Sequence, residues 1–127
     1  MLSHKYRFHG HGSLRYVYRN GQTARNRSIS VRFSTNKHRL HSRVAIVVAK
    51  KVVKSAVKRN RIRRRIYEVV RAHWGHLAPS TDIVVTVFTA ELLTMSAKEL
   101  ETTVLDALRQ GHLYKKVDSS ATLGDEL

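Results

Sequence analysis

The sequence predicts one α+β domain, a two-layer sandwich in which helices pack against a small β-sheet. Three observations support this class: segments with the two-residue alternation of strands, segments with helical spacing of apolar residues, and the interspersed order of the two kinds. With 127 residues, 42% of them hydrophobic, the chain is large enough for one core and too short for two. The expected order is helix, two or three strands, helix, strand, helix. One domain over residues 1–116 is expected, with a flexible tail over 117–127 and fraying from Tyr114.

The first helix is expected to begin at Ser13, whose side chain can cap it, and to end at Asn20-Gly21, since both residues tolerate left-handed backbone. Apolar and aromatic side chains recur between these two residues at positions i, i+3 and i+4. They are Leu14, Val17 and Tyr18. This spacing places the three side chains on one face of the helix.

Residues 26–34 alternate between apolar and polar side chains, which is typical of a strand with one buried and one solvated face. Ile29, Val31 and Phe33 are expected to face the core. The other face then carries Ser28, Ser30, Arg32 and Ser34. We expect this second face to be open to solvent.

The remaining elements follow from local signals. Residues 43–49 form a continuous, β-branched apolar run, which favours a central strand, and residues 82–89 predict a further strand. Helical spacing predicts a helix from about Ser55 to Trp74. A capping box formed by Ser96 and Glu99 begins the last helix, and Gly111 ends it.

The charge is strongly one-sided. Lys and Arg total 24 against 9 Asp and Glu, a formal net charge of +15. Residues 1–67 contain 19 of the basic residues and no acid. Such an excess repels itself and is typical of a chain that binds a polyanion. Nucleic acid is the leading candidate, an anionic membrane surface is the second, and a merely solvated charged surface is the third.

Several classes are excluded by composition. The absence of cysteine excludes disulfides, thiolate chemistry and cysteine-based zinc motifs. No apolar run reaches the length of a membrane span, and the first residues lack a hydrophobic signal core. We therefore expect a soluble cytoplasmic protein.

The segment from Lys50 to Arg65 concentrates the positive charge: nine of its sixteen residues are basic and none is acidic. Because no acid is present to pair at i+4, the segment is expected to bind a phosphate backbone. Ile62 and Ile66 would face the sheet. Asn60 could cap the helix or hydrogen-bond to RNA. The expected RNA-binding residues are Lys50, Lys51, Lys54, Lys58, Arg59, Asn60, Arg61, Arg63, Arg64 and Arg65. Replacing a single arginine at 59, 61, 63 or 64 is expected to leave stability unchanged.

This segment resembles a signature of the protein subunit of bacterial ribonuclease P. The residues that carry the resemblance are Ala-Lys-Lys at 49–51 and Lys-Ser-Ala-Val-Lys-Arg-Asn-Arg-Ile-Arg-Arg at 54–64. Weaker matches are Arg-Phe at 7–8, the spaced set Ser13, Leu14, Val17, Tyr18 and Gly21, and the segments 82–85 and 113–116. The resemblance covers about residues 7–116.

The resemblance implies a left-handed β-α-β crossover and a helix that docks on the catalytic RNA. It also implies a cleft between the first helix and the sheet for the single-stranded 5′ leader of precursor tRNA. The implied leader-binding residues are Leu14, Tyr18, Ser30 and Arg32. Leu14 stands where the family usually has phenylalanine, and Ser13 replaces the usual acid. The RNA would perform the hydrolysis with Mg²⁺, so no catalytic residue is expected in the protein.

Protein-based catalysis has little support in the sequence. Glu68 is the only acid before residue 82 and is expected to pair with Arg64, Arg65 or Arg71. The eight histidines do not form a pattern with three or four converging ligands, so no metal site is expected. A ribosomal-type structural RNA-binding protein and a membrane-surface amphipathic helix remain as alternative readings.

Overall fold

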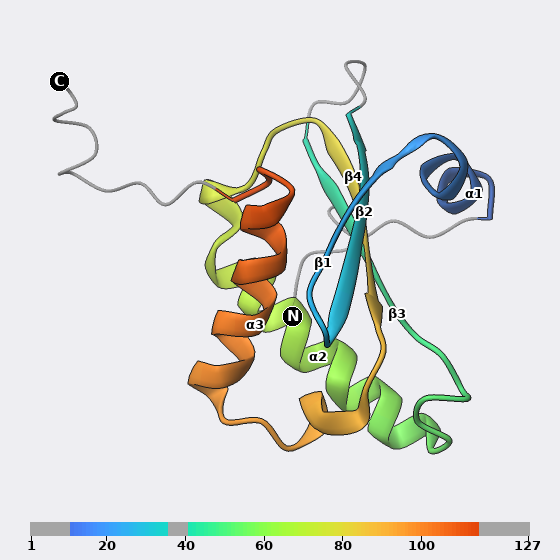
Figure 1. Cartoon of the computed structure of the whole chain (residues 1–127), viewed down its shortest axis with the longest axis vertical. Helices are drawn as coiled ribbons and strands as arrows, with labels where there is room; N and C mark the ends of the chain where they lie inside the picture. Colours follow the sequence, from blue (N-terminus) through green and yellow to red (C-terminus); the bar gives the residue numbers. More distant parts are fainter. Residues whose placement is uncertain (1–10, 36–40, 115–127) are drawn as a thin grey trace, which may run out of the picture.

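A four-stranded mixed β-sheet lies at the centre of the computed structural model, which describes residues 11–35 and 41–114 (Figure 1). The sheet order is β1-β2-β4-β3, with β3 and β4 parallel and the other pairs antiparallel. The strands are β1 (Gln22–Arg25), β2 (Ile29–Thr35), β3 (Arg43–Val48) and β4 (Thr81–Val87). The helices are α1 (His11–Asn20), α2 (Ala56–Ala72) and α3 (Ala97–Gln110), with short 3₁₀ turns at Trp74–His76 and Ala90–Leu93.

The helices cover both faces of the sheet. α2 and α3 pack side by side on one face, where Ile29, Ile62 and Ile83 belong to the main core (Figure 1). α1 lies on the other face, and its Val17 packs against Ala45 and Val84. The predicted α+β class is therefore confirmed, and α1 adds a short layer to the sandwich of sheet, α2 and α3.

Both faces of the β2 segment are buried near its start, which differs from the prediction for one of them. Ile29 and Val31 are fully buried in the main core, as predicted. Ser28 and Ser30 are only 5% and 8% exposed, so the prediction of a solvated serine face is wrong. Ser30 lies between Arg25 of β1 and Thr86 of β4, and the Ser28 carbonyl accepts a hydrogen bond from the Phe88 N–H.

Two strand assignments also differ from prediction. β1 was not identified as an element of its own, because Ala24 is its only buried residue and its other three side chains are exposed. β3 lies at the edge of the sheet and not at its centre. Its apolar run is continuous because Ala45 faces α1 while Val44 and Ile46 face the main core.

The turn between β1 and β2 is fixed by Asn26. Its Oδ1 accepts hydrogen bonds from the backbone N–H groups of Ser28 (2.9 Å) and Ile29 (3.0 Å). Its Nδ2 donates to the carbonyl of Thr103 on α3, at 3.0 Å. One side chain thus sets the hairpin turn and anchors it to the helical layer.

The end of α1 requires glycine because two backbones approach closely. The Gly21 N–H donates to the Val17 carbonyl at 2.8 Å. A Cβ atom at this position would lie 2.5 Å from that same oxygen and 2.8 Å from the Phe33 carbonyl oxygen. Helix α1 ends at Asn20, as predicted, but it begins at His11, so Ser13 lies inside the helix and not at its N-terminus.

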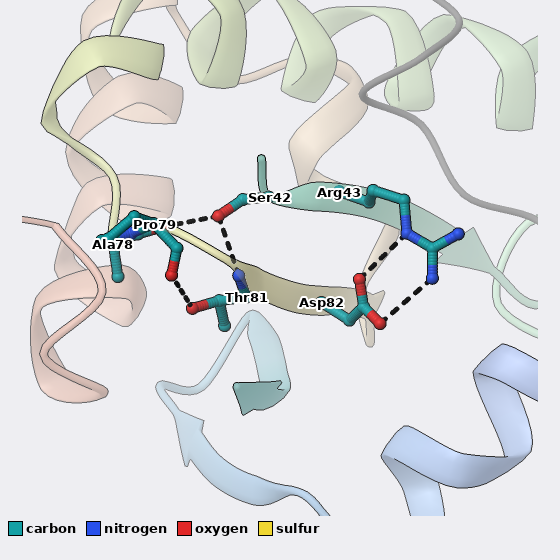
Figure 2. Close-up of polar contacts among 6 residues, drawn as sticks. All are labelled: Ser42, Arg43, Ala78, Pro79, Thr81 and Asp82. Carbon is teal, nitrogen blue, oxygen red and sulfur yellow. Dashed lines mark hydrogen bonds and ion pairs between the residues drawn. The ribbon is translucent and has the colours of Figure 1, made fainter. Parts of the chain in front are cut away.

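A buried polar network joins the first residues of β3 to those of β4 (Figure 2). Ser42 Oγ donates to the Ala78 carbonyl (2.6 Å) and accepts from the Thr81 N–H (3.0 Å). The Arg43 guanidinium binds both carboxylate oxygens of Asp82, at 3.0 and 3.1 Å. Since Arg43 and Asp82 are register partners, this network fixes the alignment of the two parallel strands. The handedness of the connection through α2 stays a prediction.

The chain is ordered at Tyr114, the residue from which fraying is predicted. Tyr114 is 7% exposed, forms a β-bridge with Leu77, and packs edge-on against His73 with ring centroids 5.5 Å apart. Fraying from Tyr114 is therefore wrong at this residue. The predicted tail, residues 117–127, lies outside the described residues.

Candidate RNA interface

Helix α2 presents one apolar and one charged face. Ser55 caps its N-terminus, with Oγ accepting from the Lys58 N–H at 3.3 Å. Ile62 and Ile66 are fully buried against the sheet, as predicted. The opposite, exposed side carries residues spaced i, i+4, i+7 and i+11, which we call the outer ridge: Val57, Arg61, Arg64 and Glu68.

Two predicted RNA-binding arginines are engaged within the protein. The Arg59 guanidinium donates to the carbonyls of Val53 (2.9 Å) and Lys54 (2.8 Å), in the loop before α2. The Arg65 guanidinium donates to the carbonyls of Leu92, Leu93 and Met95, which precede α3. Both side chains are half-buried, and through these hydrogen bonds each connects a loop to α2. The expectation that replacing Arg59 leaves stability unchanged does not agree with these contacts.

Asn60 and Arg63 form a pair on the flank of α2, where Asn60 Oδ1 accepts a hydrogen bond from the Arg63 guanidinium. Because Ser55 is the cap of α2, the capping role considered for Asn60 is excluded. Asn60 is exposed, and Arg63 is half-buried. The pair orients a guanidinium beside the outer ridge.

The other predicted cations are exposed and continuous with the outer ridge. Four lysines lie in the loop before α2 and in its first turn. None of these lysines, and neither Arg61 nor Arg64, has an acidic partner within residues 11–35 and 41–114. We call this set the basic surface: Lys50, Lys51, Lys54, Lys58, Arg61 and Arg64.

The single acid of α2 stands at the far end of the outer ridge. Glu68 Oε1 accepts two hydrogen bonds from Arg71, at 3.1 and 2.8 Å, so Arg71 is its partner among the three that the sequence allowed. This hydrogen bonding, above all other causes, lowers the pKa of Glu68 to about 2. The carboxylate therefore keeps its negative charge throughout the neutral pH range.

Among the implied leader-binding residues whose side chains the structure describes, Tyr18 is the exposed one, at 42%. Arg32 is half-buried: it donates to Thr23 Oγ1 at 2.9 Å and to the Tyr18 carbonyl, with its guanidinium 5.9 Å from the Tyr18 ring. Arg32 thus holds the end of α1 on the sheet. Ser30 is buried beneath this side. The side chain of Leu14 lies outside the described residues.

A second aromatic group lies on the same sheet face and was missed by the sequence reasoning. Phe88 is 43% exposed, and the Arg25 guanidinium lies 5.4 Å from its ring centroid. Register places Arg25 opposite Ser30, and Ser30 opposite Thr86, two residues before Phe88. Alternation along β4 could have found it, since Phe88 shares the parity of Val84 and Thr86. We call this set the sheet face: Tyr18, Arg25, Arg32 and Phe88.

His73, at the end of α2, makes contacts within the protein. His73 Nε2 lies 2.9 Å from Glu101 Oε2, and its Nδ1 lies 3.3 Å from the Tyr114 hydroxyl. Within the described part of the chain, no three His, Asp or Glu side chains are grouped so that they could hold a metal ion. In the same part of the chain, no helix is long and apolar enough to cross a membrane.

Both the sequence and the fold of this chain are similar to those of known proteins. A family model described as Ribonuclease P matches residues 2–111. A "Ribonuclease P protein component" from a Synechococcus species is 30% identical, covering 98% of this chain and 96% of that protein. One from Staphylococcus carnosus is 29% identical, covering 87% and 94%. The solved ribonuclease P protein of Staphylococcus aureus superposes with a TM-score of 0.77 at 27% identity, covering 87% and 98%.

Proposed function

Because the chain belongs to the ribonuclease P protein family, we propose that its basic surface binds the catalytic RNA of ribonuclease P and its sheet face binds the 5′ leader of precursor tRNA. As a protein component of ribonuclease P, the chain takes part in tRNA processing. In the proposed role it assists cleavage that the RNA performs with Mg²⁺, in the cytoplasm, and supplies no catalytic group of its own.

The RNA-binding proposal is supported above all by which arginines of α2 have hydrogen-bond or acidic partners within the protein and which do not. Arg61 and Arg64 have no acidic partner among the described residues, whereas Arg59 and Arg65 donate to backbone carbonyls. Arginines without an acidic partner on one exposed ridge repel one another. A phosphate backbone offsets this repulsion, and each phosphate can accept two hydrogen bonds from one guanidinium. The lysines before α2 extend the same surface. Arg63 and Asn60 would reach RNA from the flank.

The sheet face supports the leader-binding proposal by its chemistry. Tyr18 and Phe88 are exposed aromatic rings, each with a guanidinium within 6 Å of its centroid. Unpaired bases stack on such rings without regard to sequence, and guanidinium groups attract the adjoining phosphates. A subunit that serves many precursors needs this tolerance of sequence. Arg32 would act here by holding α1, and Ser30 by letting the chain pack closely.

Reconstitution tests the proposed function. With ribonuclease P RNA and precursor tRNA at low Mg²⁺, adding the protein is expected to raise 5′ cleavage well above that of the RNA alone. Protein alone with Mg²⁺ is expected to cleave nothing. Strong binding of RNA without any effect on cleavage would favour a structural RNA-binding protein. Robust cleavage by protein alone would contradict the proposed division of labour.

Tyr18→Ala and Phe88→Ala are each expected to weaken binding of leader-bearing precursor tRNA by about fivefold or more, because base–aromatic stacking contributes about 1–3 kcal/mol. Affinity for mature tRNA should not change. Tyr16→Ala is the matched control, since Tyr16 is a neighbouring ring of α1 that is 59% exposed and outside the sheet face. Equal losses of affinity for precursor and mature tRNA would show that the leader does not bind the sheet face.

A further inference from the structure

The residues between β3 and α2, residues 49–55, form a loop that carries three of the six members of the basic surface (Figure 1). We call it the connecting loop. Two of its N–H groups, those of Val52 (3.0 Å) and Val53 (3.2 Å), donate to the Ala49 carbonyl and close a turn. The Val53 side chain is 6% exposed and belongs to the main core. The connecting loop is therefore attached to the protein at its start and in its middle.

Arg59, in the first turn of α2, binds the last part of the connecting loop. Its backbone N–H donates to the Ser55 carbonyl (2.9 Å), and its Nη1 donates to the carbonyls of Val53 (2.9 Å) and Lys54 (2.8 Å). One residue thus binds three consecutive carbonyl groups. Hydrogen bonds from a charged donor are stronger than neutral ones, and Arg59 is half-buried, which partly shields them from water. Arg59 therefore fixes the backbone of the loop immediately before the helix.

We propose that Arg59 is a positioning residue in RNA binding, which holds the backbone that carries Lys50, Lys51 and Lys54 and does not itself bind a phosphate. The proposal rests on the RNA-binding role of the basic surface given above. The three lysines are exposed, and a loop that must become ordered when RNA binds loses conformational entropy at that step. A loop that is fixed before the RNA arrives avoids this loss, so the same phosphate contacts give a higher affinity.

The salt dependence of binding separates this role from direct contact. Loss of one direct phosphate contact lowers the affinity and also reduces the salt slope by about 0.7–0.9. Loss of a positioning residue lowers the affinity, but the lysines still reach their phosphates, so the number of ionic contacts and the salt slope are kept. Arg61 and Arg64 are expected to show the first behaviour, and Arg59 the second.

A double-mutant cycle tests the proposal. Arg59→Ala is made in the original chain and in a variant with Lys50→Ala, Lys51→Ala and Lys54→Ala, and binding of transcribed ribonuclease P RNA is measured over a series of salt concentrations. In the original chain, Arg59→Ala is expected to weaken binding by about fivefold and to change the salt slope by less than about 0.3. In the lysine variant it is expected to weaken binding by less than about twofold, because the connecting loop no longer carries charge.

The Arg61→Ala, Arg64→Ala double variant is the matched background, because it keeps all lysines of the connecting loop. Arg59→Ala should again weaken binding by about fivefold there. Equal losses in all three backgrounds would show a general effect on folding or on net charge and would overturn the proposal. A salt slope reduced by about 0.7–0.9 in Arg59→Ala would show a direct phosphate contact and would overturn it as well.

Amide hydrogen exchange of the free protein measures the connecting loop without RNA. In Arg59→Ala, the N–H groups of Val52 and Val53 are expected to exchange about tenfold faster or more, whereas Arg64→Ala should leave their exchange unchanged. Unchanged exchange in Arg59→Ala would contradict a positioning role. If Arg59→Ala does not fold, Arg59→Gln is measured in its place. Full RNA affinity in the Arg61→Ala, Arg64→Ala double variant would instead contradict the proposed function, and the exchange result would stand by itself.

Discussion

Replacing Arg61 and Arg64 together with alanine is expected to weaken binding of ribonuclease P RNA by about tenfold or more and to reduce the salt slope by about 1.4–1.8, as two phosphate contacts are lost. Both side chains are exposed on the outer ridge, and neither has an acidic partner among the described residues. Their removal also relieves repulsion within the acid-free segment, so the free energy of unfolding should not fall. Filter binding across a salt series, with thermal unfolding of the free protein, measures both quantities.

The matched comparison for this double variant is an exposed cation outside the basic surface. Arg109→Ala removes one positive charge from the last turn of α3, where the guanidinium lies 5.2 Å from the Tyr114 ring. It is expected to have little effect on RNA affinity. If Arg109→Ala weakens RNA binding as much as the double variant does for each charge removed, then the net positive charge of the whole protein accounts for the affinity. The outer ridge would then have no special role.

Arg65→Ala, in contrast, is expected to lower the free energy of unfolding by about 2–3 kcal/mol. The variant loses charged hydrogen bonds and leaves the carbonyl groups that accepted them without this donor. The three carbonyl groups, those of Leu92, Leu93 and Met95, lie in the segment between β4 and α3. Without the guanidinium, that segment loses these hydrogen bonds to α2, while Leu92 stays in the main core. Chemical denaturation of the free protein measures the effect directly.

Arg64→Ala serves as the control for Arg65→Ala, because it removes the same type of side chain from the preceding position of the same helix. Its stability should lie within about 0.5 kcal/mol of the original chain, as for most exposed substitutions. An Arg65→Ala protein as stable as Arg64→Ala would show that the carbonyl contacts are dispensable. Arg65 would then return to the candidates for direct RNA binding.

Local signals in the sequence were sufficient for the helices of the main core. The predicted helix from Ser55 to Trp74 is observed as Ala56–Ala72 with Ser55 as its cap. The Ser96 cap is confirmed by its hydrogen bond from the Glu99 N–H at 3.1 Å. Helix caps and apolar spacing depend on residues within one or two turns, so they can be read before the fold is known.

The features that were wrong or missing depend on residues distant in the chain. Gln22–Arg25 has no clear alternation and becomes a strand because β2 pairs with it. Ser30 is buried although its neighbours in sequence do not show it, because β1 and β4 flank it in the sheet, with Arg25 and Thr86 as its register partners. The carbonyls that Arg65 binds are 27 to 30 residues away. Spacing along a helix separates apolar from polar faces, but it does not show which arginines are engaged within the protein.

The position of β4 in the sheet bears on how a newly made chain folds. β4 lies between β2 and β3, and it pairs with residues far away in the sequence: Ile29, for example, is the register partner of Val87. Until β4 has been synthesised, β2 and β3 have no strand to join them, and α2 has no completed sheet to pack on. Contacts of such long sequence separation form slowly. We therefore expect the first 67 residues, which contain no acid, to leave the ribosome as an incompletely folded polycation, before the strand that completes their sheet has been made.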